Sequence, residues 1–167
     1  MKRLVKLLAP VLLAVLVLVP VVIAQGTPIA EVDTSAGETI FNSNCMACHQ
    51  TNGQGIPGAF PPLAGHLPDV LALDGSREYV IDVVLYGLQG AVNINGMAYN
   101  SVMTPWGAMF DDQQVADVLN YAAVAWDNGA ALPEGFAAFT ADEVAAQRAT
   151  PLDAAGVYAK RQALGLE

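Results

Sequence analysis

The chain has 167 residues and a formal net charge of −9 at pH 7. Three of its seven basic residues lie in the first six positions, which leaves four against 16 acidic residues, a charge of −12, in residues 25–167. Such a surface repels nucleic acid and anionic lipid headgroups, and it favours a basic or largely uncharged partner. The alternative is a generic acidic surface that keeps an exported protein soluble. The length suits one domain with a tail.

The N-terminal segment has the pattern of an export signal. Lys2, Arg3 and Lys6 precede an apolar run over residues 7–24, which contains Pro20 near its end. This order is typical of a secretory signal peptide, so residues 1–24 predict export to the periplasm or to the outer face of the cytoplasmic membrane. An uncleaved membrane anchor through residues 7–24 is the alternative. Cleavage is favoured over it, because spanning a bilayer takes about 20 apolar residues and this run of 18 could barely do so.

A linker and then a helix are expected after this segment. Residues 25–34 contain Gly26 and Pro28 and show no periodic apolar pattern, which indicates a linker. Ser35, with Glu38 three residues later, has the spacing of a capping box, so a helix is predicted to begin there.

The motif that carries the chemistry is Cys45-Met46-Ala47-Cys48-His49, where two thiols and an imidazole meet. Cys-x-x-Cys-His is the signature of covalent c-type haem attachment. Two cysteines three residues apart on one helical turn can both reach the vinyl groups of one porphyrin, and His49 then lies beneath the iron as an axial ligand. The motif therefore predicts one covalent haem c.

Other interpretations of the two cysteines fit the sequence less well. A thioredoxin-like dithiol requires strands around Cys45, and the flanking pattern is helical with turn residues. A structural disulfide is less favoured still. A zinc site would need His66 or a carboxylate as a fourth ligand, in a spacing that matches no common zinc motif.

Helices and loops alternate in the rest of the chain. Residues 50–69 contain eight glycines and prolines, which predicts a structured loop, and so do residues 89–107, which are rich in Gly and Asn. A helix is expected from Asp74 or Ser76 to Gly87. Asp111 and Gln114 predict a capping box on a helix that ends near 128–129. Thr140 and Glu143 have the same spacing, and further short helices are expected in a C-terminal helical extension, residues 129–167.

The second axial ligand would decide between electron transfer and an open haem site. The candidates are Met46, Met97, Met103 and Met109, with His66 as a histidine rival. Met46 lies inside the attachment motif and cannot reach the opposite face. Met109 is expected to pack in the core beside Phe110. Met103 is best placed, because it lies in an irregular loop stiffened by Pro105.

These motifs together resemble class I cytochrome c over about residues 35–128. The resemblance includes Gly37-x-x-x-Phe41 before the haem motif, Pro62-Leu63-x-Gly65 after it, Met103-x-Pro105, and Leu119-x-Tyr121 in the last helix of the core. The stretches 55–65 and 95–100 are similar to monohaem domains fused to oxidase subunit II or copper nitrite reductase.

The resemblance implies an all-α cytochrome c fold, with helices and loops wrapped around one covalent haem. His49 and Met103 would be the iron ligands, the Pro62 carbonyl would accept a hydrogen bond from His49, and the face of Gly37 and Phe41 would cross the last core helix near Tyr121. From their loop positions, the expected pocket-lining residues are Phe60, Leu63, Ile94, Val102 and Trp106.

The expected function is one-electron transfer between a respiratory complex or dehydrogenase and a terminal acceptor such as an oxidase, without enzymatic activity of its own. Two alternatives remain open at this point. One is a subunit held permanently in an oxidoreductase complex, and the other is an open-site haem enzyme or gas sensor.

Overall fold

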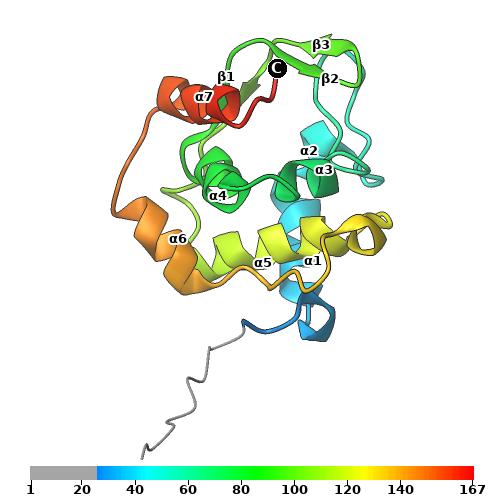
Figure 1. The fold of residues 1–167 in the computed structure, drawn as a ribbon, viewed down its shortest axis with the longest axis vertical. Helices are drawn as coiled ribbons and strands as arrows, with labels where there is room; N and C mark the ends of the chain where they lie inside the picture. Colours follow the sequence, from blue (N-terminus) through cyan, green and yellow to red (C-terminus); the bar gives the residue numbers. More distant parts are fainter. Residues whose placement is uncertain (1–25) are drawn as a thin grey trace, which may run out of the picture.

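A computed structural model describes residues 26–167, so the predicted export segment, residues 1–24, lies outside the described residues. The described chain is mostly helical (Figure 1). Its helices are η1 (Ile29–Glu31), α1 (Ser35–Asn44), α2 (Met46–His49), α3 (Leu67–Leu71), α4 (Ser76–Tyr86), α5 (Asp112–Val124), η2 (Asn128–Ala131), α6 (Ala141–Arg148) and α7 (Ala154–Ala163). Within residues 26–167, no helix combines the length and the apolar character needed to cross a membrane.

Two small antiparallel ladders lie in the segment that the sequence predicts as a loop. β1 (Leu88–Gln89) pairs with β4 (Val102–Met103), and β2 (Val92–Ile94) pairs with β3 (Met97–Tyr99). The turn between β2 and β3 is Asn95-Gly96, with positive φ at both residues, which is the chemistry of a tight hairpin. Strands of two or three residues are too short to show a period-two pattern, so the sequence pattern does not indicate them. The fold departs here from a purely helical one.

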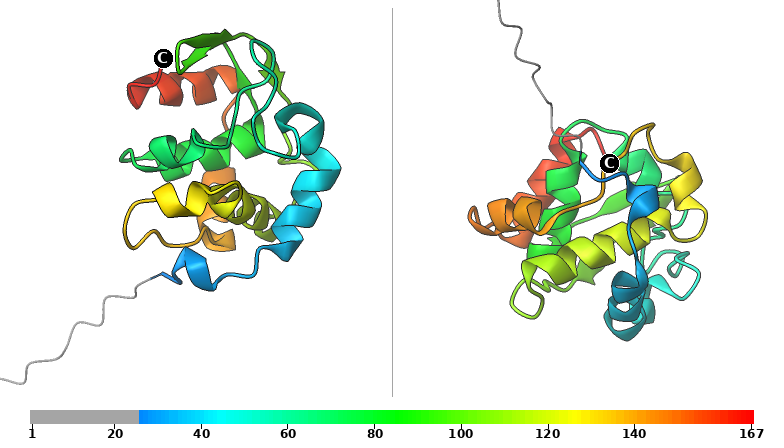
Figure 2. Two further views of the ribbon diagram at one scale, coloured as in Figure 1. Left: turned by 90° about the vertical axis from the view of Figure 1, so that its right-hand side faces the viewer. Right: turned by 90° about the horizontal axis from the view of Figure 1, so that it is seen from below.

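The helices stack in layers beside a crossing pair. Figure 2 shows α7, α4 and α5 one above another in its left view, with α1 at one side, and α1 packs against α5. At the crossing, a Cβ on Gly37 would overlap the Asp117 carbonyl oxygen and lie 2.8 Å from the Cβ of Tyr121. Phe41 packs on Tyr121 with ring centroids 5.4 Å apart. The expected crossing of Gly37 and Phe41 near Tyr121 is therefore present in the structure.

The structure confirms some helix ends and corrects others. Asp111 and Gln114 form the predicted capping box of α5. The box predicted at Ser35 is absent, because Ser35 is already helical and its N–H donates to Asp33 Oδ1 at 2.9 Å. The end of α5 lies at Val124, before the predicted 128–129, since Trp126 and Asp127 take positive φ. The predicted helix of residues 76–87 corresponds to α4, which ends before Gly87.

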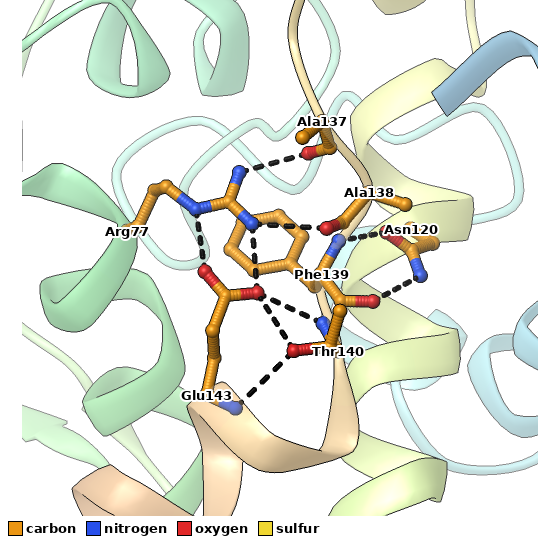
Figure 3. A network of polar contacts seen from close by, with 7 residues as sticks. All are labelled: Arg77, Asn120, Ala137, Ala138, Phe139, Thr140 and Glu143. Atoms are coloured by element: carbon orange, nitrogen blue, oxygen red, sulfur yellow. Dashed lines mark hydrogen bonds and ion pairs between the residues drawn. The ribbon is translucent and has the colours of Figure 1, made fainter. Parts of the chain in front are cut away.

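The C-terminal residues are tied to the core by polar contacts. Figure 3 shows Arg77 of α4 in a bidentate ion pair with Glu143 of α6, while its other donors reach the carbonyls of Ala137 and Ala138. The guanidinium also lies 4.2 Å from the ring centroid of Phe139. Glu143 completes a capping box with Thr140, as the sequence predicts. The start of the extension is thus held against the N-terminal end of α4.

The segment predicted as a linker contacts the extension. The Ala138 N–H donates to the Thr27 carbonyl at 2.9 Å, and the Ile29 N–H donates to the Phe136 carbonyl at 3.2 Å. Residues 27–31 therefore run beside residues 136–138. The division into residues 25–34, 35–128 and 129–167 stays a prediction.

Candidate functional site

The attachment motif lies where α1 gives way to α2. Cys45 is the residue between the two helices, and the N–H groups of Cys48 and His49 both donate to its carbonyl, at 3.2 and 2.9 Å. This tight turn directs both sulfurs and the imidazole to the same cavity, and no disulfide joins the two thiols. Burial raises the pKa of the Cys45 thiol to about 11, so its sulfur is uncharged. The motif thus presents two sulfurs and one imidazole on a single wall.

His49 is held in one orientation by a backbone carbonyl. The side chain is 8% exposed, and its Nδ1 donates to the Pro61 carbonyl at 3.0 Å, which leaves Nε2 free to bind a metal. Burial lowers the pKa of His49, and the bond to Pro61 opposes that shift without cancelling it. The imidazole is therefore neutral, as metal ligation requires. The partner is Pro61 and not Pro62, a correction of one residue that the sequence could not resolve, because two adjacent prolines offer adjacent carbonyls.

One largely apolar cavity brings together every site residue expected from the sequence. Its lining includes Cys45, Cys48, His49, Phe60, Pro62, Leu63, Ile94, Val102, Met103 and Trp106. The walls also include residues that sequence reasoning missed, mainly apolar side chains of the core: Phe41, Leu67, Val70, Val80, Val83, Val84, Leu88, Val92, Phe110, Val118, Leu119 and Ala122. Many of them follow the apolar stripes of α3, α4 and α5, which is the signal that could have identified them.

Among the methionines of the described chain, Met103 alone lines the cavity. Met97 is 44% exposed and Met109 is 71% exposed. The expected core packing of Met109 is wrong, because the turn of residues 107–110 buries the neighbouring Phe110 and leaves Met109 in solvent. The geometry thus leaves Met103 as the available thioether.

The cavity has a polar end that involves the C-terminal extension. Arg161 of α7 is 3% exposed and donates to the Tyr79 hydroxyl at 3.3 Å, and both residues line the cavity with His66. Burial is the main cause that lowers the pKa of His66, and the Arg161 charge lowers it further, so His66 is neutral. Sequence reasoning missed Arg161, because no pattern in the neighbouring residues distinguishes a buried arginine from an exposed one in a polar helix.

The arrangement fits a covalently held haem. Two sulfurs and a neutral imidazole share one wall, apolar side chains form most of the lining, and one buried cation stands at the polar end. The profile of the family described as "Cytochrome c" matches residues 34–124, more than half of the chain. The chain belongs to the cytochrome c family.

Curated relatives support the same assignment. Over 142 residues, 85% of this chain and 92% of the relative, this cytochrome c is 49% identical to a "Cytochrome c-552" of Thermus thermophilus. A second "Cytochrome c-552" of the same species is 51% identical over 125 residues, covering 75% of this chain and 94% of the relative. The "Alcohol dehydrogenase (quinone), cytochrome c subunit" of Gluconobacter oxydans is 34% identical over 58% of this chain and 19% of its own length.

Membership of the cytochrome c family establishes the general chemistry of the protein. The protein is a monohaem class I cytochrome c that binds one covalent haem c through Cys45 and Cys48, and it is an electron-transfer protein rather than an enzyme. The match ends at residue 124, so the extension lies beyond the family profile although it contributes Arg161 to the cavity.

Proposed function

We propose that this cytochrome c is an exported one-electron carrier whose haem iron is held by His49 and Met103. In this role it would pass electrons from a respiratory complex or dehydrogenase to a terminal acceptor such as an oxidase. The observation that carries the proposal is the position of Met103, the one methionine of the described chain that shares a cavity with His49. Nitrogen on one face and sulfur on the other favour electron transfer over ligand binding.

The chain's own residues keep the site rigid and apolar. The bound haem supplies an iron that alternates between ferrous and ferric forms. Pro61 fixes the His49 ring, and apolar side chains of α4 and α5 pack together and line the cavity. A site whose two ligands stay in place in both oxidation states needs little reorganisation, which favours fast electron transfer.

An apolar rim offers a place for partners to dock. Val102 is 58% exposed although it lines the cavity, and Ile56 is 40% exposed on the neighbouring loop. Ser101 Oγ donates to the Ala59 carbonyl at 2.5 Å, which joins the two loops. Exposed apolar side chains at a cavity mouth are typical of a contact surface for transient complexes.

The charge distribution favours a partner without an acidic docking face. All four cations of residues 26–167 donate to groups of the chain itself: Arg77 to Glu143, Arg148 to Asp112, Lys160 to Asp82, and Arg161 to Tyr79 and the Glu167 carbonyl. Most of the acidic side chains are exposed. A basic partner would therefore be attracted, with an attraction that falls with added salt, and a largely uncharged partner would not be repelled.

The test is the sulfur-to-iron charge-transfer band of the oxidised haem protein. We expect the wild type to show it, Met103→Ala to lose it, and Met97→Ala to keep it, because Met97 is exposed and outside the cavity. The variant His66→Gln should also keep the band. A wild type without the band, or a Met103→Ala protein that retains it, would reject Met103 as the ligand and favour His66 or an open site.

A further inference from the structure

The strand that carries Met103 is too short to hold its own position. β4 consists of Val102 and Met103 and pairs only with β1, where Leu88 lies opposite Met103. A ladder of two residues is marginal in water without packing from outside. Gly87, which joins α4 to β1, lies so close that a Cβ there would overlap the Met103 carbonyl oxygen. The backbone of Met103 is therefore held in position by residues 87–89.

Tyr158 of α7 packs against the continuation of that segment. Its ring lies flush on Gly90, where an added Cβ would be 2.6 Å from both Cδ2 and Cε2 of Tyr158. Its hydroxyl donates to the Ala91 carbonyl at 2.7 Å. The side chain also packs with the small cluster of Val92, Ile94 and Tyr99. One side chain of the extension thus holds the connection between β1 and β2.

The helix α7 is itself firmly seated. Val157 is fully buried in the main core, and Lys160 pairs with Asp82, whose side chain is fully buried on α4. Arg161 of the same helix donates at 2.8 Å to the Glu167 carbonyl, which also accepts the N–H of Asn93 in β2 at 2.9 Å. The helix that carries Tyr158 is therefore held in place, and it lies beside β1 (Figure 1).

We propose that Tyr158 is a positioning residue for Met103, which keeps the β1–β4 ladder closed and so holds the thioether sulfur at the iron. This inference rests on the proposed ligation by Met103. It gives the extension a role in ligand geometry, in addition to its contribution to the core.

The experiment measures how readily added imidazole displaces Met103 from the ferric haem protein, at a temperature where every variant is folded. Opening of the ladder frees the iron, so apparent imidazole affinity rises in proportion to the open fraction. We expect Tyr158→Phe, which loses only the hydroxyl bond, to bind imidazole about threefold more tightly. Tyr158→Ala, which also loses the ring, should bind it about tenfold more tightly, with a weaker charge-transfer band.

A matched control is Glu143→Gln, which weakens another tie of the extension, one made to Arg77 of α4 and not to the segment that Tyr158 contacts. Its imidazole affinity should stay within about twofold of the wild type, although its stability falls. If Tyr158→Ala does not fold, Tyr158→Phe and Tyr158→Leu still decide the matter. Wild-type affinity in the Tyr158 variants, or an equal rise in Glu143→Gln, would overturn the inference. A wild type that binds imidazole as tightly as Met103→Ala would instead reject the proposed ligation.

Discussion

The two sides of the haem cavity are built in different ways. The side of Cys45, Cys48 and His49 comes from one turn of chain that directly follows α1, and α1 packs closely on α5 at Gly37. The side of Met103 comes from a two-residue ladder, and its outer support is a helix more than 50 residues further along the chain. The first side depends on local sequence and one tight crossing, whereas the second depends on contacts between distant segments. Substitutions should therefore affect the two sides differently.

The largest effect on stability should come from the crossing of α1 and α5, which supports the side of Cys45, Cys48 and His49. Gly37→Ala places a methyl group on the Asp117 carbonyl, so α1 must move away from α5. We expect a loss of about 3 kcal/mol in the free energy of unfolding, at the upper end of overpacking effects. Denaturant unfolding measures it. Gly129→Ala is the control, since its Cβ would meet only ordinary contacts from 3.4 Å and should cost less than about 0.5 kcal/mol. Equal losses in both variants would contradict a special role for Gly37.

An intermediate effect should come from the tie between the extension and α4. Burial raises the pKa of Glu143, but the Arg77 guanidinium and the Thr140 bonds outweigh it and leave the pKa below 4.5. Because the folded pKa is lowered, this stabilisation is present above the unfolded value and disappears as the pH falls through the folded one. Glu143→Gln should cost about 1 kcal/mol at pH 7, a modest figure because about a third of the carboxylate is exposed.

The pH profile of unfolding separates this ion pair from a packing effect. The difference between wild type and Glu143→Gln should shrink towards zero in acid, once the wild-type carboxyl is protonated. A difference that stays constant as the pH falls well below the ordinary range of a glutamate would show that the substitution acts through packing and not through charge.

The sequence was most informative where the chemistry is local. The haem motif, the capping boxes at Asp111 and Thr140, and the helix before Gly87 all depend on residues within one or two turns. The predicted hydrogen-bond acceptor of His49 is the Pro62 carbonyl, whereas the structure shows the Pro61 carbonyl. The choice between these two neighbours depends on the conformation of the whole loop. The roles of Tyr158 and Arg161 could not be predicted, since long-range packing alone brings α7 to the cavity wall.

The smallest effect should come from a side chain that the sequence placed in the core. Met109 is largely exposed and lies outside the cavity lining, so Met109→Ala should change the free energy of unfolding by less than about 0.5 kcal/mol. It should also leave the charge-transfer band intact. Thermal unfolding followed at that band measures both, and a loss above about 1 kcal/mol would indicate a contact that the exposed position does not suggest.

The position of α7 along the chain has a consequence for biosynthesis. A ribosome makes the thiols of Cys45 and Cys48 long before it makes Tyr158, since domains are synthesised from their N-terminal end. While the polypeptide is still growing, the cysteines are already present and the helix that backs the opposite wall is not. The two walls of the cavity therefore become available in order along the chain, the wall of the cysteines before the wall that α7 supports.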